Sequence, residues 1–148
     1  MCLTMFVVQV REANILDSSQ IKELSEQLGY NVPETGVRSS LEYLIKDNCH
    51  EIFVAEVDSK VVGWIHISLH KSLVIEERAI VLGLVVDRKF RRQGIGRKLM
   101  LRVESWAENC GCHGLMLRSN VIREDAHSFY CGIGYKNVKS QYVFTRQF

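Results

Sequence analysis

The sequence has a single proline, Pro33, and it contains no repeat, low-complexity segment or stretch rich in proline, glycine and serine. Nothing in it therefore looks like a linker between domains. Its 148 residues suit one domain that can bury a substantial core. We expect a single domain over residues 1–148.

Long hydrophobic runs are also missing, since no apolar stretch approaches the roughly 20 residues of a membrane-spanning helix. The first residues, MCLTMFVVQVREAN, lack the basic start of a signal peptide. The five cysteines form no CxxC pair, and Cys110-Gly111-Cys112 is too tightly spaced for a zinc knuckle. These features predict a cytoplasmic protein without a metal, whose reduced thiols are mostly buried as small hydrophobic side chains.

An excess of charge of one sign is absent too, because the net charge is only +2. No overall field would attract nucleic acid. Positive charge is concentrated instead between Arg88 and Lys98. This cluster could be a solvated surface or a nucleic-acid patch, and the second alternative predicts an affinity for DNA or RNA that falls steeply with salt.

The hydrophobic pattern predicts strands and helices in alternation. The second of these helices would follow Pro33, and the first would begin at a capping box of Asp17 and Gln20. Because residues 79–118 read as strand, helix, strand, the outer two strands should run parallel. We expect an α/β fold, with a mixed sheet of about six or seven strands and about four helices on its two faces. The expected strands are 5–10, 51–57, 60–69, 79–86, 115–118, 135–139 and 141–146, and the expected helices are about 17–28, 34–48, 94–109 and 125–131.

Residues 91–98, with the sequence RRQGIGRK, stand between a predicted buried strand and the start of a helix. The first N–H groups of a helix lack backbone partners, and the helix dipole makes that end positive. Glycines let a ligand approach the backbone, and arginines supply forked donors for phosphate oxygens. The segment therefore predicts a cradle for a phosphate or a pyrophosphate. A Walker loop and a dinucleotide fingerprint both fail, because Leu99 follows Lys98 where the first needs Ser or Thr and the second needs glycine.

The same stretch resembles the [Q/R]-x-x-G-x-[G/A] signature of the GNAT superfamily of acyl-CoA-dependent N-acetyltransferases. Residues 83–87, GLVVD, are similar to that family's fourth strand, and residues 120–135 are similar to its segment after the fifth strand. The resemblance covers essentially the whole chain. It implies the GNAT fold, with acetyl-CoA as the co-substrate and an amine as the acceptor.

By this resemblance, the backbone of residues 91–98 would hold the pyrophosphate of acetyl-CoA. The strand before it would pair with the amide groups of the pantetheine arm, as an added strand would. The family's fourth and fifth strands splay apart to allow this pairing. Arg123 stands where many relatives have an asparagine, so Asn120 is expected to contact the arm instead. The residues expected to bind the co-substrate are Leu84, Val85, Val86, Arg91, Arg92, Gln93, Gly94, Ile95, Gly96, Arg97, Lys98, Asn120 and Tyr130.

The resemblance also places a general acid at Tyr130. A phenol with a pKa of about 10 can share a proton with a departing thiolate whose conjugate acid has a pKa of about 8.5. The backbone N–H of Val86, or of a neighbour, would face the developing oxyanion. Cys131 invites a scheme through an acetyl-cysteine, but a cysteine that packs the helix is the simpler interpretation.

The general base is harder to place, because Ile80 and Val81 stand where many relatives have a glutamate. Glu77 and His70 rank first as candidates. Glu76 and His66 are alternatives, and a base acting through water, or none at all, is also open.

We expect an N-acetyltransferase that uses direct attack in a ternary complex, with a small-molecule amine slightly preferred as acceptor. A protein lysine or N-terminus is the alternative acceptor, and a non-catalytic CoA-binding regulatory module is the alternative function. The resemblance further suggests a homodimer through the C-terminal strands.

Overall fold

The computed structural model of the protein describes residues 6–148, so Met5, in the first predicted strand, and Cys2 lie outside the described residues. The chain divides into two compact units, residues 1–118 and residues 119–148. Each unit is described by itself. The prediction of a single domain stays a prediction.

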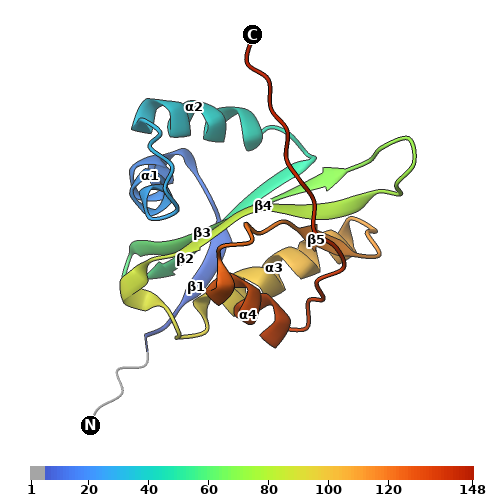
Figure 1. Cartoon of the computed structure of the whole chain (residues 1–148). Helices are drawn as coiled ribbons and strands as arrows, with labels where there is room; N and C mark the ends of the chain where they lie inside the picture. The colour runs from blue at the N-terminus through green and yellow to red at the C-terminus, as the bar shows by residue number, and fades with distance from the viewer. Residues whose placement is uncertain (1–5) are drawn as a thin grey trace. The chain divides into compact units, whose positions relative to one another are not determined.

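A five-stranded sheet in the order β1-β2-β3-β4-β5 forms the centre of the first unit (Figure 1). The first three pairings are antiparallel, and β4 pairs with β5 in parallel, which confirms the predicted strand–helix–strand unit. The bounds of the strands are Gln9–Glu12 for β1, His50–Val57 for β2, Lys60–His70 for β3, Arg78–Val86 for β4 and Leu115–Leu117 for β5.

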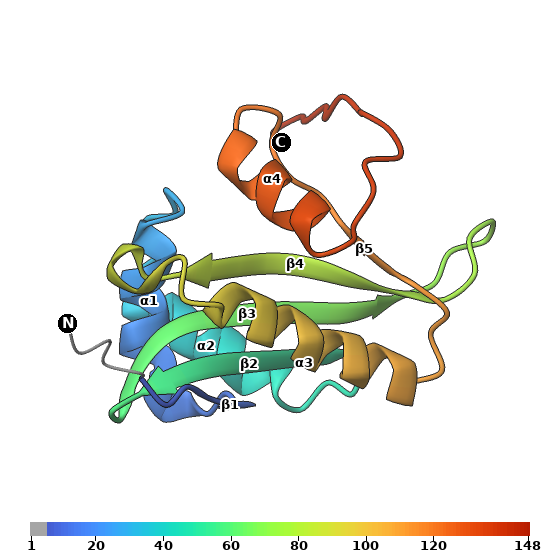
Figure 2. The same ribbon diagram turned by 90° about the horizontal axis from the view of Figure 1, so that it is seen from below.

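Helices cover both faces of this sheet, as the sequence predicts (Figure 2). On one face lie α1 (Ser18–Glu26) and α2 (Glu34–Leu44), and on the other lies α3 (Ile95–Asn109). The apolar stripe of α3 is buried against the strands, which fixes where its N-terminus points. The core beneath α1 and α2 consists of Ile21, Leu24, Leu41, Ile52, Val54, Val61 and Val85.

The capping box of the first helical segment lies three residues earlier than predicted. Asn14 and Asp17 form it, at the start of the short 3-10 helix η1 (Ile15–Asp17), so the predicted box of Asp17 and Gln20 is wrong. Asp17 is already bound by the N–H of Asn14 and by the Arg11 guanidinium. Its carboxylate is directed to these partners, and it makes no side-chain hydrogen bond as the N-cap of α1. The helix α2 ends at Leu44 rather than near residue 48.

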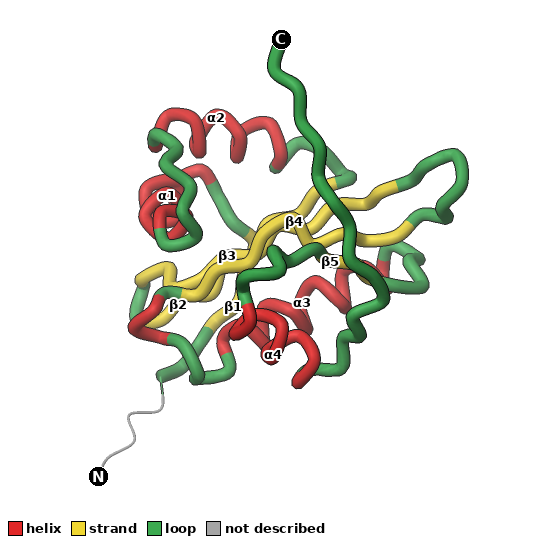
Figure 3. The backbone as a smooth tube through the Cα atoms, viewed as in Figure 1, coloured by secondary structure: helices red, strands yellow, loops and turns green. Residues whose placement is uncertain are grey.

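The second unit contains one helix, α4 (Glu124–Gly132), and no strand among its residues. The predicted strands at 135–139 and 141–146 are therefore wrong, and the sheet has five strands rather than six or seven. Figure 3 draws these residues as loop. A strand persists only when its backbone groups join a ladder, and none forms here within the described residues. Tyr142, Val143 and Phe144 are exposed as a result.

The cysteines also differ from the prediction. Cys49, Cys110, Cys112 and Cys131 are free thiols, as expected, but Cys112 is only half-buried and the others are exposed. The prediction that they are mostly buried is therefore wrong for these four. In the described part of the chain, no helix is long and apolar enough to cross a membrane. The predicted cytoplasmic location stays a prediction.

Candidate functional site

The strand β4 has an open edge over its C-terminal half. On one side β3 pairs with β4 along its whole length. On the other side β5 reaches only residues 79–81 of β4. Within the first unit, residues 82–86 thus border no strand on that side, and we call them the open edge of β4. The register with β3 also slips at Leu82, a β-bulge that leaves this side chain exposed.

Backbone groups in an antiparallel ladder alternate between the two sides of a strand. Asp87 donates its N–H to the carbonyl oxygen of Val62 at 2.8 Å, so the residue two before it, Val85, also faces β3. Leu84 and Val86 then direct their N–H and C=O groups toward the open edge. Arg91 agrees with this orientation, because its Nε donates to the carbonyl oxygen of Val86 at 3.0 Å.

The glycine turn follows directly. Gly94 has the left-handed conformation, with φ of 80°, and it is the residue that precedes α3. The N–H of Lys98 bonds to the oxygen of Gly94 at 3.1 Å, so the N–H groups of the three residues between them have no preceding helical carbonyl. A Cβ added to Gly94 would meet nothing within 4 Å, which leaves room in front of these donors. The predicted cradle, residues 91–98, thus adjoins the open edge of β4.

The loop between strand and helix is fixed by side chains from both ends. The Asp87 carboxylate accepts the N–H of Lys89 at 3.0 Å, at the start of the 3-10 helix η2 (Arg88–Phe90). Gln27, just after α1, accepts the N–H of Arg88 at 3.0 Å. Ile95 and Leu99 are buried and anchor the first turn of α3. The side chains of Arg91, Arg92, Arg97 and Lys98 are exposed around a fixed backbone.

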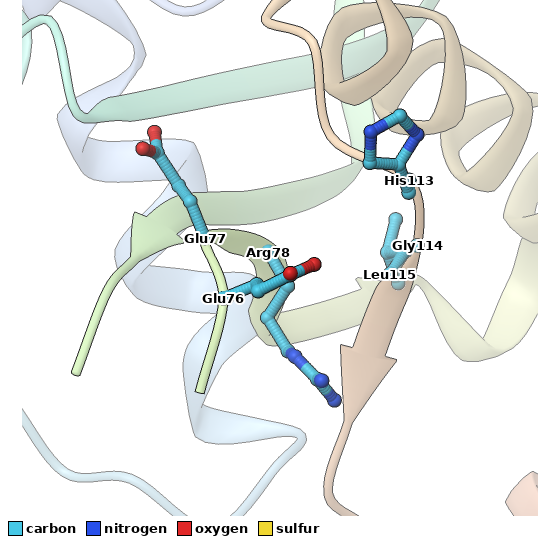
Figure 4. A pocket seen from close by; sticks show the side chains of 6 residues that line it. All are labelled: Glu76, Glu77, Arg78, His113, Gly114 and Leu115. Atoms are coloured by element: carbon cyan, nitrogen blue, oxygen red, sulfur yellow. The ribbon is translucent and has the colours of Figure 1, made fainter. Parts of the chain in front are cut away.

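The two candidate bases ranked first lie at the other end of β4. His70 pairs with Arg78, the first residue of β4. Glu77 precedes that residue and lines a pocket of about 210 Å³, where it and Arg78 point in opposite directions (Figure 4). At about 3.3 Å per residue, six to seven residues of strand put Glu77 and Arg78 about 20 Å from Leu84. The full lining of this pocket is Glu76, Glu77, Arg78, His113, Gly114 and Leu115.

A different histidine lies one strand away from the open edge. His66, on β3, stands opposite Gly83 in the ladder. Its Nε2 is 2.9 Å from Nδ1 of His50. Burial, and then the charge of His50, lower the pKa of His66 to about 4. The alternation of Trp64, His66 and His70 on one face is visible in the sequence, but the register that sets His66 against Gly83 is not.

In the second unit, Tyr130 lies on α4, with ring contacts to Phe129 and Tyr135 at centroid distances of 5.2 and 6.2 Å. Burial raises the pKa of Tyr130, although the nearby charge of Arg123 acts in the opposite direction. The phenol is therefore protonated at neutral pH, as a proton donor must be.

The loop before α4 is tied together by Asn120. Its Oδ1 accepts the N–H of Ile122 at 3.1 Å, and its carbonyl oxygen lies 2.9 Å from Nε2 of His127. The side-chain oxygen and the carbonyl oxygen of Asn120 are therefore already bonded within the loop. Across residues 6–148, no three His, Cys, Asp or Glu residues are grouped in a way that could hold a metal ion.

Comparison with known proteins places this arrangement in context. The model of the acetyltransferase (GNAT) family matches residues 18–135. The aminoalkylphosphonate N-acetyltransferase of Salmonella typhimurium strain LT2 is 30% identical over 149 residues, which cover 95% of this chain and 91% of that protein.

Solved structures share the fold. The aminoglycoside N-acetyltransferase AAC(6')-Iy in complex with CoA has a TM-score of 0.86 at 18% identity, covering 99% of both chains. Its complex with the bisubstrate analogue CoA-S-monomethyl-acetylneamine gives 0.86 at 17% identity, covering 95% of this chain and 99% of that one. At these identities the likeness shows the fold alone.

Proposed function

Because the chain belongs to the acetyltransferase (GNAT) family, and so is an N-acetyltransferase, we propose that it moves the acetyl group of acetyl-CoA to a small-molecule primary amine. The amine attacks the thioester directly, with both substrates bound at once. One observation carries this proposal: the open edge of β4 leads without interruption into the cradle at the start of α3.

Acetyl-CoA fits this arrangement along its length. Its pyrophosphate would accept hydrogen bonds from the N–H groups at the start of α3, where the helix dipole favours negative charge. Its pantetheine amides would pair with the outward groups of Leu84 and Val86, as an added strand does. Val85 turns its backbone toward β3 and its side chain is buried in the core beneath α1 and α2, so it would support the site without touching the arm. In solved structures of a protein with the same fold, CoA and a CoA-linked bisubstrate analogue are bound.

The chemistry needs a donor for the oxyanion and a proton for the thiolate. An outward N–H group of Leu84 or Val86 that the pantetheine arm leaves unpaired would face the thioester, which supports it as the oxyanion donor. Tyr130 supplies the proton in this proposal, and its raised pKa keeps the phenol protonated. Asn120 would contact the pantetheine arm through its amide group. Direct attack leaves no role for Cys131, an exposed residue of α4.

The acceptor is proposed from the relatives. An aminoalkylphosphonate and an aminoglycoside are both small primary amines, and they name the activities of proteins that match nearly the whole chain. The aminoalkylphosphonate comes first, because that relative is the more similar in sequence. A protein lysine or N-terminus is the alternative acceptor.

A panel of amines tests the proposal. Purified protein is incubated with acetyl-CoA and 2-aminoethylphosphonate, neamine, spermidine or a lysine peptide, and the released CoA is separated by chromatography. Exposed thiols of the protein would react with thiol reagents, so chromatography avoids that background. We expect turnover with at least one small amine and none with the peptide. Tight acetyl-CoA binding without turnover would instead indicate a non-catalytic binding module.

We also propose a homodimer. Tyr142, Val143 and Phe144 are 91%, 86% and 90% exposed, and three adjacent apolar side chains of this size favour burial against a second copy. Sedimentation of the purified chain and of a Phe144→Ser variant measures this, and a wild-type monomer at micromolar concentration would contradict it.

A further inference from the structure

On the face of the sheet covered by α1 and α2, three side chains form a line from the interior outward. His66 Nε2 lies 2.9 Å from Nδ1 of His50. Nε2 of His50 lies 3.9 Å from Oδ2 of Asp47, and these two side chains are 24% and 34% exposed. Asp47 is held in place, since its Oδ1 accepts the N–H of Cys49 at 2.9 Å. The line thus joins a half-buried imidazole to solvent.

The inner end of this line lies one strand away from the open edge of β4. His66 shares a face with Ile52 and stands opposite Gly83. Opposite residues of such a ladder have Cα atoms about 4.5–5.5 Å apart, so the imidazole reaches across one strand. Gly83 has no side chain, and the indole of Trp64 takes the space over it. Trp64 and His66 are both only half-buried on this face, so an amine that approaches the thioester beside the indole is within reach of the imidazole.

Trp64 completes the surface around His66. Its indole lies over Gly83, so close that a Cβ there would be 2.7 Å from the ring. Its Nε1 is buried and has no hydrogen-bond partner among the described residues. A buried donor without a partner costs free energy, so a polar group that paired with this N–H would be favoured here.

We propose that His66 is the catalytic base that takes a proton from the acceptor amine, and that His50 is a positioning residue that passes this proton toward Asp47 and solvent. The inference rests on the acetyl transfer proposed above. It assigns the base to a histidine of β3, whereas the residues of β4 at the usual position are Ile80 and Val81.

Overall the reaction releases one proton, and the relay carries it to solvent. An N–H bond of the ammonium group breaks, and its proton bonds to Nδ1 of His66. The proton on Nε2 of His66 moves to Nδ1 of His50, and the proton on Nε2 of His50 leaves toward Asp47 or water. The freed lone pair of the amine then attacks the thioester carbon, the C–S bond breaks, and the thiolate takes a proton from Tyr130. The nitrogen, now part of the amide, gives up its second excess proton, which restores the phenol of Tyr130.

The environment of His66 keeps this base uncharged, and its pKa of about 4 makes it a weak base that does not retain the proton. At neutral pH its imidazole is uncharged and can accept a proton, because burial and His50 lower its pKa. Once protonated, it gives the proton up readily to His50. The charged and titratable groups that the structure places on this line are His50 and Asp47.

Three variants and two pH values test the relay. The rates of His66→Gln, His50→Gln and, as a matched control, His113→Gln are measured with the best amine of the panel. At about pH 7, we expect kcat to fall about 100-fold or more for His66→Gln and about tenfold for His50→Gln, with His113→Gln unchanged. At about pH 9.5 a basic amine is largely deprotonated in solution, so the loss for His66→Gln should shrink. The Kd for acetyl-CoA, measured by calorimetry, should stay the same.

Several outcomes would overturn the relay. They are unchanged turnover in His66→Gln, an equal loss at both pH values, and a parallel loss of acetyl-CoA affinity, which would reveal a structural role. If His66→Gln folds poorly, His66→Ala with added imidazole replaces it, and the relay predicts partial recovery with imidazole that Tyr130→Phe does not show. A wild type that binds no acetyl-CoA, or that is inactive with every amine, overturns the proposed function and the relay together.

Discussion

The indole of Trp64 lies across Gly83 on the neighbouring strand. A Cβ built on Gly83 would come within 2.7 Å of Cη2 and 2.8 Å of Cζ3 of that ring. The glycine is needed here for space, because it lets an aromatic ring cover the strand just beyond the bulge at Leu82. The acceptor side of the proposed site depends on this contact.

We expect Gly83→Ala to destabilise the protein by about 1–3 kcal/mol, the usual cost of forcing a methyl group into a packed site. Displacing the indole should also raise KM for the amine more than the Kd for acetyl-CoA. Gly114→Ala is the control, since a Cβ there meets nothing within 4 Å. Urea denaturation and steady-state kinetics measure both effects, and equal stability of the two variants would contradict the steric argument.

Long periodic segments of the sequence predicted the structure well. The apolar stripe of residues 95–110 predicted α3, and Asp58-Ser59 predicted the turn between β2 and β3, where both residues have positive φ. These features are local, so a window of the sequence contains the information that determines them. The glycine turn belongs to the same class, because strand, turn and helix follow one another directly.

Long-range pairing could not be predicted in the same way. The pattern at 141–146 suits a strand, but a strand also needs a neighbour, and the pattern does not supply one. The sequence likewise showed His66 and His70 on one face, whereas the register and the bulge at Leu82 place His66 opposite Gly83, one strand away from the open edge. The identity of the proposed base therefore depends on the ladder, which the sequence alone does not specify.

Gly94→Ala should weaken acetyl-CoA binding at least tenfold. Its φ of 80° costs a residue with a side chain about 1–2 kcal/mol, and the new methyl would fill open space within the cradle that a diphosphate needs. Gly29→Ala is a matched control, because Gly29 has φ of 90° and equally open surroundings but lies outside the cradle. Both variants should lose similar stability, and only Gly94→Ala should lose affinity in calorimetry. Equal affinities would contradict the proposed pyrophosphate site.

Tyr130→Phe should lower kcat by about 100-fold while leaving the Kd for acetyl-CoA nearly unchanged, because only the proton to the thiolate is lost. Tyr142→Phe, at a tyrosine of the same unit that is 91% exposed, is the control. Stopped-flow or steady-state rates with the best amine measure the difference. Full activity of Tyr130→Phe would exclude it as the general acid.

His66 should make stability depend on pH. Its pKa is about 4 in the folded protein against an ordinary value of 6.5, so the unfolded chain binds the proton more readily. Stability should therefore fall as the pH drops from about 6.5 toward 4. The raised pKa of Glu51, which burial causes, opposes this trend in part. Thermal melts of the wild type should show a steeper decline over this range than His66→Gln, and parallel curves would contradict the burial of an uncharged imidazole.

Asp17 should be the main acid-sensitive support of the first helical segment. Burial alone would raise its pKa, but hydrogen bonds from Arg11 and from the N–H of Asn14 prevail and lower it. Its stabilising effect should thus persist above its ordinary pKa of 3.8 and be lost below it, as the pH falls through the lower folded value. At neutral pH, Asp17→Asn should cost about 2 kcal/mol, since two charge-assisted hydrogen bonds are weakened in a buried place. Glu56→Gln, which changes the other carboxylate on Arg11 at a more exposed position, should cost less. Urea denaturation measures both costs. If Glu56→Gln were the more destabilising change, burial would not explain the strength of the Arg11–Asp17 pair.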